Sequence, residues 1–266
     1  MERKLTCIIC PLGCELIVKS EDKKILDISG HTSPRGKAYA EYECIAPKRT
    51  LTTTVRCVGG GLVPVKTATP IPKEKMINLE IFDYLIDNPE NKKIERTSDN
   101  YKSVIIAGNL DKMKAAYAYD LPDETQFVLY GPNYTGKKDG NITYKGSFPP
   151  DDLPFVLEGG FGLVWDGISS ETCAGVWGEY LKYNNPHKTS LYLASGLPLV
   201  IWEKAALADF VVKNGCGITV ASLFDIPEAI NKVTKDEYEA MLRNTKEVSE
   251  KLVSGYFLER ASQIKK

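Results

Sequence analysis

The feature that most constrains the fold of this chain is a series of short, continuous apolar runs that begins near residue 101. The runs "KSVIIAGNL" and "QFVLYGP" come first, and "GLVWDG" and "PLVIWEK" follow with the helical stretch "HKTSLYLASG" between them. Continuous apolar strands that alternate with helices are typical of a parallel sheet buried on both faces. The sequence therefore predicts an α/β domain over residues 101–266.

The residues before 101 have a different composition. Residues 1–75 are rich in β-branched residues, glycine and turn signals, with almost no helical periodicity, and they predict a small, mainly β domain of short antiparallel strands. Residues 76–100 follow two prolines, Pro70 and Pro72, and end in a polar, charged stretch, which predicts a linker. A chain of 266 residues is long enough for two such domains.

Composition excludes several classes of protein. The net charge of −1 gives no electrostatic basis for nucleic acid as the main partner. No apolar run approaches the roughly 20 residues that span a bilayer, and the N-terminal stretch is too short for a signal peptide. We therefore expect a cytoplasmic protein, and its oligomeric state stays open.

Three of the seven cysteines lie within nine residues, in "TCIICPLGC". Cys7, Cys10 and Cys14 supply three soft thiolate ligands in one tight loop, which suits an iron-sulfur cluster or zinc if a fourth ligand comes from elsewhere. An odd number of cysteines with three clustered suits a reducing compartment better than a disulfide framework. The alternative is three reduced cysteines that hold no metal.

The N-terminal domain resembles an uncharacterised bacterial family of CxxC-motif proteins that accompany FAD-dependent dehydrogenases of the glycerol-3-phosphate type. The resemblance rests on "TCIICPLGC", "SPRGKAYA", "PKRTLTTTVR" and "PVKTATPIPKEK", and it implies a flavin dehydrogenase as a partner. The cysteine spacing is also similar to that of molybdopterin oxidoreductases, but Ser33 stands at the position of their fourth cysteine. Either the site holds a labile three-iron cluster, or Cys44, Cys57 or His31 replaces the fourth ligand, or the site is empty.

The second domain resembles the C-terminal, nucleotide-sugar-binding half of bacterial β-1,6-galactofuranosyltransferases and glucosyltransferase 3 enzymes. The resemblance covers residues 77–262 and rests on "EGGFGLVWDG", on the stretch from Glu179 to Leu223, and on the closing "GYFLERA". It implies a Rossmann-like half of a GT-B fold, a UDP-sugar donor, and hexosyl or galactofuranosyl transfer in the synthesis of cell-surface polysaccharide or glycoprotein.

The stretch "YNNPHKTSLYLASG" predicts an anion site. Pro186 suits the start of a helix, and Lys188, Thr189 and Ser190 then fall in the first turn, where free backbone amides favour a diphosphate. Lys188 would add charge and the two hydroxyls would add hydrogen bonds. The alternative is a solvated lysine at a helix start.

Other candidate residues follow predicted strands and would line the same site. Gly108 allows close approach of a ligand and Asn109 is expected to cap the next helix, while Asp166 would bind sugar hydroxyls. The turn after Tyr144 would bind and stack the uracil base, or is a plain surface turn. The predicted donor site comprises Gly108, Asn109, Tyr144, Gly146, Ser147, Phe148, Asp166, Asn185, Lys188, Thr189 and Ser190.

The resemblance covers only the donor-side half of a GT-B enzyme, and no part of this sequence resembles the acceptor-side half. No catalytic residue is predicted. Half of a cleft can bind a nucleotide sugar without efficient transfer, because transfer requires both substrates in a closed site. Three hypotheses remain: a glycosyltransferase or its remnant, a metal-binding redox accessory protein, and a non-catalytic sugar-nucleotide binding module.

Overall fold

The computed structural model describes residues 2–9, 12–21, 24–50, 52–56, 62–66, 68–72, 80–84, 86, 95–99 and 101–263. The chain divides into two compact units, the first ending at Asn78 and the second beginning at Leu79. The predicted domain limits at residues 75 and 100 stay predictions.

The first unit is a small antiparallel sheet with one helix. Strands β1 (Glu2–Thr6), β2 (Glu15–Glu21) and β3 (Lys24–Ser29) pair in that order, and α1 (Pro34–Ile45) packs on β2 and β3. Leu16 and Val18 of β2 are fully buried beneath the helix together with Ala40. Two antiparallel ladders follow, β4 (Lys48–Arg49) with β7 (Ile71–Pro72) and β5 (Thr52–Arg56) with β6 (Leu62–Lys66). The predicted small, mainly β region is confirmed.

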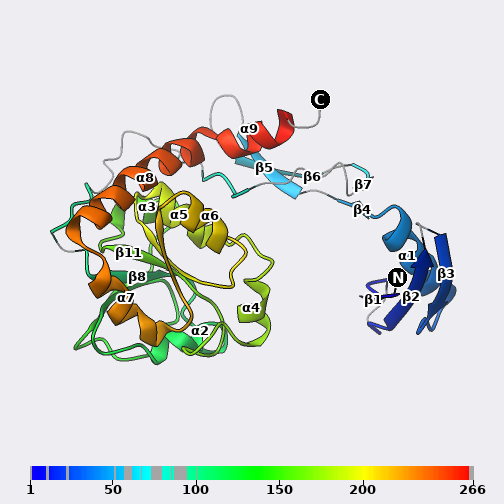
Figure 1. Cartoon of the computed structure of the whole chain (residues 1–266), viewed down its shortest axis with the longest axis horizontal. Coiled ribbons are helices and arrows are strands. Elements are labelled where there is room, and N and C mark those ends of the chain that lie inside the picture. Colours follow the sequence, from blue (N-terminus) through cyan, green and yellow to red (C-terminus); the bar gives the residue numbers. More distant parts are fainter. Residues whose placement is uncertain are drawn as a thin grey trace. The chain divides into compact units, whose positions relative to one another are not determined.

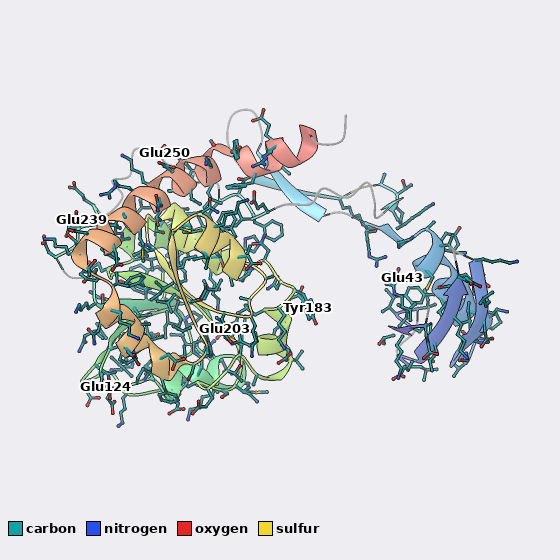
Figure 2. The ribbon with its side chains drawn as sticks, in the orientation of Figure 1. Glu43, Glu124, Tyr183, Glu203, Glu239 and Glu250 are labelled. Atoms are coloured by element: carbon teal, nitrogen blue, oxygen red, sulfur yellow. The ribbon has the colours of Figure 1, made fainter. Side chains whose placement is uncertain are left out.

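Helix α1 is a difference from the sequence prediction, which expected almost no helix here. Ser33 is the N-cap and accepts a hydrogen bond from the Gly36 amide at 3.3 Å, and Pro34 stands at the first helical positions. Only Gly36, Ala40 and Glu43 are buried, so no apolar stripe marks this helix in the sequence. The Glu43 carboxylate, labelled in Figure 2, accepts two hydrogen bonds from the Arg49 guanidinium.

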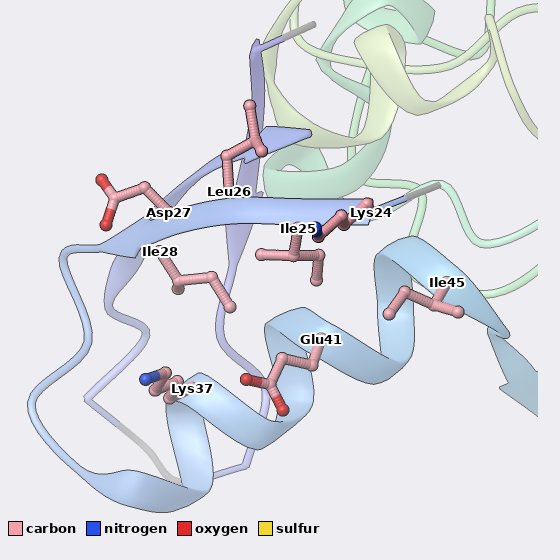
Figure 3. A pocket seen from close by; sticks show the side chains of 8 residues that line it. All are labelled: Lys24, Ile25, Leu26, Asp27, Ile28, Lys37, Glu41 and Ile45. Carbon is pink, nitrogen blue, oxygen red and sulfur yellow. The ribbon is translucent and has the colours of Figure 1, made fainter. Parts of the chain in front are cut away.

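An open groove of about 560 Å³ lies between β3 and α1 (Figure 3). Ile25 and Ile28 point from the strand towards the helix, while Leu26 points away from it. Lys37 and Glu41 place opposite charges on the helical wall. The groove contains none of the residues predicted for the donor site.

The second unit is a six-stranded parallel sheet with helices packed on it. The strand order is β10-β9-β8-β11-β12-β13, and every neighbouring pair is parallel. The strands are β8 (Ser103–Ala107), β9 (Gln126–Tyr130), β10 (Ile142–Gly146), β11 (Phe161–Val164), β12 (Leu199–Trp202) and β13 (Gly217–Val220). This is the doubly wound order 3-2-1-4-5-6, so the predicted Rossmann-like α/β fold is confirmed.

Helices pack on the sheet as the alternating pattern predicts. Helix α5 packs against β11 and β12, α6 packs against β12 and β13, and α8 lies across α5 (Figure 1). The helices are α2 (Lys112–Ala115), η2 (Ala116–Tyr119), α3 (Leu153–Val156), α4 (Gly175–Tyr180), α5 (His187–Ala194), α6 (Ala208–Lys213), η3 (Leu223–Asp225), α7 (Ile226–Lys232), α8 (Lys235–Ser254) and α9 (Tyr256–Gln263). Strands β8, β11 and β12 are buried along their whole length.

Residues 80–84 belong to this second unit although they precede its first strand. The side chain of Ile81 is fully buried in the core around the sheet. The Asp83 carboxylate accepts hydrogen bonds from the Phe257 and Leu258 amides at 3.2 and 2.7 Å, which satisfies the free amides at the start of α9. This segment therefore joins the core to the C-terminal helix.

We predict that Gly131→Ala destabilises the second unit more than Gly140→Ala does. Both glycines have positive φ, 137° and 66°, but a Cβ at Gly131 would lie 1.7 Å from the Gly108 carbonyl oxygen, whereas a Cβ at Gly140 meets nothing within 4 Å. The backbone strain costs about 1–2 kcal/mol at either site, and the clash adds about 1–3 kcal/mol at Gly131. Urea unfolding followed by tryptophan fluorescence measures this, because all three tryptophans lie in the second unit. Equal midpoints for the two variants would contradict it.

Candidate donor site at the carboxyl edge of the sheet

The candidate site lies where the carboxyl ends of the six parallel strands meet. Glu203, labelled in Figure 2, directly follows β12 and marks this edge. The strand order reverses between β8 and β11, the position at which doubly wound sheets bind ligands. The segments that follow these two strands contact one another through a parallel bridge between Ala115 and Gly167.

Lys188 and Asp166 meet at this reversal point. The Lys188 ammonium donates to Asp166 Oδ1 at 2.9 Å and to the Trp165 carbonyl oxygen at 2.7 Å. Both side chains are 17% exposed, so the ion pair is partly shielded from water. The two residues, which were predicted to lie at one edge of the sheet, are therefore in contact there. In this structure they form an ion pair.

Tyr192 fixes the helix that carries Lys188. Its hydroxyl accepts a hydrogen bond from the Ala107 amide at 2.7 Å, at the carboxyl end of β8. Its ring lies against Gly162 of β11, where a Cβ would come within 2.3 Å of the ring. Because Lys188 and Tyr192 are four residues apart on one face of α5, this contact brings Lys188 towards the end of β8 and Gly108. Sequence reasoning missed Tyr192, since a buried tyrosine in a helix has no distinguishing pattern.

Three glycines with positive φ end the neighbouring strands β8, β9 and β10. The Gly108 amide donates to the Tyr130 carbonyl at 3.0 Å, and the Gly131 amide donates to the Gly146 carbonyl at 2.8 Å. The structure thus brings the predicted Gly108 and Gly146 into one row, with Gly131 between them. Gly131 was missed because "YGPN" reads as an ordinary turn.

Asn109 does not cap the next helix, as the sequence led us to expect. Asp111 is the N-cap of α2 and accepts from the Met113 amide at 2.8 Å. The Asn109 side chain instead accepts from the Asp111 amide and from Asn133 Nδ2, each at 3.0 Å. Asn109 therefore organises the loop between the strand and the helix.

The turn predicted for the uracil base lies two strands from β8, at the edge strand β10. The Tyr144 hydroxyl donates to the Gly131 carbonyl at 2.8 Å, and the Tyr144 ring packs on Tyr134. The Phe148 ring packs on Tyr130 with centroids 5.9 Å apart, while Ser147 is exposed. Two strand spacings place this turn about 10 Å from β8, within the span of a nucleoside diphosphate.

The first turn of α5 contains two kinds of hydroxyl. Ser190 donates to the Phe82 carbonyl oxygen at 2.6 Å, so it holds residues 80–84 in this structure. Thr189 is fully buried, and neither its Oγ1 nor Asn185 Oδ1 has a hydrogen-bond partner among the described residues. Buried polar atoms are normally paired, so these two remain available to a ligand or a water molecule.

We predict that Thr189→Val and Ser190→Ala change the stability of the second unit in opposite directions. Valine removes an unpaired buried hydroxyl with little change in shape, which should raise the free energy of unfolding by about 1 kcal/mol. Alanine at position 190 removes the bond to Phe82 and should lower it by about 1 kcal/mol. Urea unfolding by tryptophan fluorescence compares the two, and a loss for Thr189→Val would show that its hydroxyl is already paired.

Burial keeps the other ionisable groups near the site protonated. Burial is the main cause that raises the pKa of the Cys173 thiol to about 12, while a hydrogen bond with the Asp166 backbone opposes this rise. The pKa values of the Tyr117 and Tyr192 hydroxyls are also raised by burial. These three groups are therefore uncharged at neutral pH, and they lie near the ion pair of Lys188 and Asp166.

The predicted metal ligands lie in the first unit. The Cys14 thiol hydrogen-bonds with the Thr32 hydroxyl at 3.1 Å, and the Cys7 thiol lies beside Gly36 in the first turn of α1. Cys10 lies outside the described residues, as does Cys57, and among the residues that are described no three metal-ligating side chains are placed to hold one ion. The hydroxyl of Ser33, which stands at the position of the fourth cysteine in molybdopterin oxidoreductases, caps α1. The metal site stays a prediction.

The fold and its carboxyl edge define the second unit as a Rossmann-like domain. Residues 104–264 match the family described as glucosyltransferase 3-like, C-terminal domain. The match covers more than half of the chain, and the chain belongs to this family.

Two relatives extend the match. The chain is 42% identical to the β-1,6-galactofuranosyltransferase WbbI of Escherichia coli (strain K12) over 188 residues, which are 70% of this chain and 55% of that protein. It is 29% identical to glucosyltransferase 3 of Streptococcus gordonii over 134 residues, 50% of this chain and 39% of that protein. The chain thus spans about half the length of these relatives or less.

Among solved structures, Anabaena HepE in complex with UDP superposes with a TM-score of 0.39 at 12% identity. The superposition covers 63% of this chain and 49% of that chain.

Residues 34–86 match a second family, described as a protein of unknown function (DUF1667). The predicted presence of two families in one chain is confirmed, although this match begins after the cysteine loop. The family description names no flavin enzyme, so the dehydrogenase partner stays a prediction. Within the described residues, no helix combines the length and the apolar character that crossing a membrane requires.

Proposed function

We propose that the second unit binds a nucleotide sugar, with UDP as the nucleotide, and supplies the donor half of a hexosyl or galactofuranosyl transfer. The observation that carries the proposal is the meeting of Lys188 and Asp166 at the reversal of strand order. The names of the E. coli and streptococcal relatives support the same reaction class. Surface polysaccharide or glycoprotein synthesis is the context that this chemistry fits.

The proposed binding step exchanges one anion for another at Lys188. In the structure the ammonium is paired with Asp166, and a diphosphate that enters at the start of α5 would take over this charge. The Thr189 hydroxyl would gain a partner at the same time. During transfer the leaving UDP gains negative charge, which Lys188 and the free amides of α5 would stabilise. Asp166, once released from Lys188, would accept hydrogen bonds from the sugar hydroxyls.

We predict that Lys188→Met weakens UDP binding roughly ten- to a hundredfold. The loss corresponds to about 1.5–3 kcal/mol for a hydrogen bond to a charged group. Asp166→Asn should have the opposite effect on UDP, a gain of roughly fivefold, because it removes about 1 kcal/mol of repulsion between carboxylate and diphosphate. Calorimetry with UDP and then with UDP-glucose measures both, and the gain should disappear for the sugar nucleotide.

The control is Lys232→Met on α7, which removes an exposed ion pair with Glu228 and should leave UDP affinity unchanged. Circular dichroism checks that each variant is folded. Equal affinity of the wild type and Lys188→Met would remove Lys188 from the site, and absence of UDP binding to the wild type would overturn the proposed function.

We also propose that the two predicted domains fold separately, with residues 80–84 of the predicted linker packed into the second domain. The division of the chain near residue 79 supports this arrangement. Limited proteolysis is expected to cut between residues 68 and 79 and to leave a C-terminal fragment that includes residues 80–84. This fragment should unfold at the same temperature as the second unit does in the full chain. Loss of both parts at the same rate would contradict separate folding.

A further inference from the structure

The three clustered cysteines were expected to act together, but the structure pairs two of them. The ladder of β1 and β2 runs from Glu2 opposite Lys19 to Thr6 opposite Glu15, and its next step sets Cys7 opposite Cys14. The Cys7 amide donates to the Cys14 carbonyl at 2.8 Å, which extends the ladder by this step. Residues directly opposite in an antiparallel pair have Cα atoms about 4.5–5.5 Å apart and side chains on one face.

This spacing is the one that a disulfide needs, since bridged cysteines have Cα atoms about 4.4–6.8 Å apart. Both thiols lie on the side of the sheet that α1 covers: Cys7 is 3% exposed within the core of the unit, and Cys14 packs against that core. The loop that joins them carries exposed Ile8, Ile9 and Leu12. The backbone around the pair is therefore at the surface and reachable by a small thiol reagent.

We propose that Cys7 and Cys14 form a reversible dithiol–disulfide site whose substrate class is small disulfides of the glutathione type. The half-buried Cys14 thiolate attacks the external disulfide, so a mixed disulfide forms on Cys14 and one reduced thiol leaves. The Cys7 thiolate then attacks the Cys14 sulfur, which closes the Cys7–Cys14 bond and releases the second reduced thiol. Two electrons pass from the protein to the small disulfide.

Formation of the Cys7–Cys14 disulfide changes a contact at the start of α1. In the dithiol form the Cys14 thiol hydrogen-bonds with the Thr32 hydroxyl, next to the N-cap Ser33. A disulfide sulfur has no proton to donate, so the bridged form keeps at most a weak acceptor there. The buried thiols of Cys173 and Cys216 do not compete, because burial raises the pKa of each to about 12 and keeps them protonated.

The test treats the full chain, stripped of metal with EDTA, with excess oxidised glutathione. Iodoacetamide blocks thiols that stay free, and N-ethylmaleimide labels those released by a later reduction. Trypsin places all three clustered cysteines in one peptide, residues 5–19, so fragmentation of that peptide assigns each label. We expect maleimide on Cys7 and Cys14 and iodoacetamide on Cys10 and Cys44.

Three variants sharpen the result. Cys10→Ser and the matched control Cys44→Ser should close as the wild type does, whereas Cys7→Ser should stop with glutathione on Cys14. A bridge that includes Cys10, or glutathione that stays on Cys14 in the wild type, would overturn the proposal. So would zinc or iron that survives EDTA and protects all three cysteines, because the cluster would then be a metal site. Labelling of the wild type decides the question even if Cys7→Ser does not fold.

Discussion

The contact of Tyr192 with two strands sets the geometry on which the rest of the second unit depends. Its ring occupies the space that Gly162 leaves open on β11, and its hydroxyl accepts from the end of β8. One side chain therefore spans the point at which the strand order reverses. The position of Lys188 one turn earlier follows from this contact, as does its bond to the residues after β11.

Much of the α/β fold could be predicted because the signal is local. The strands β8, β9, β11 and β12 are short apolar runs, and the start of α5 is marked by Pro186. The edge strand β13 and helix α1 were not assigned. In β13 only Val220 is buried, and in α1 the buried positions are a glycine, an alanine and a glutamate, so neither has an apolar pattern.

The candidate site could be predicted only in part, because its order arises from contacts between distant segments. The types of residue at the carboxyl ends of strands indicated Gly108 and Asp166, and the predicted helix start after Pro186 indicated Lys188. No sequence pattern indicates that Lys188 forms an ion pair with Asp166, or that the Ser190 hydroxyl donates to the Phe82 carbonyl oxygen. These partners lie 22 and 108 residues away along the chain. Hydrogen-bond partners at such separations depend on packing that no local pattern encodes.

Residues 80–84 have a consequence for how two families came to share one chain. The DUF1667 match extends to residue 86, yet Ile81 is core to the other unit and Asp83 anchors its last helix. If the two families were joined after residue 86, the DUF1667 segment supplied both Ile81 and Asp83 to a core and a helix, α9, of the other family. If they were joined before residue 80, residues 80–84 came from the same family as the core that they pack against. The structural boundary near residue 79 therefore lies upstream of residue 86, where the DUF1667 match ends.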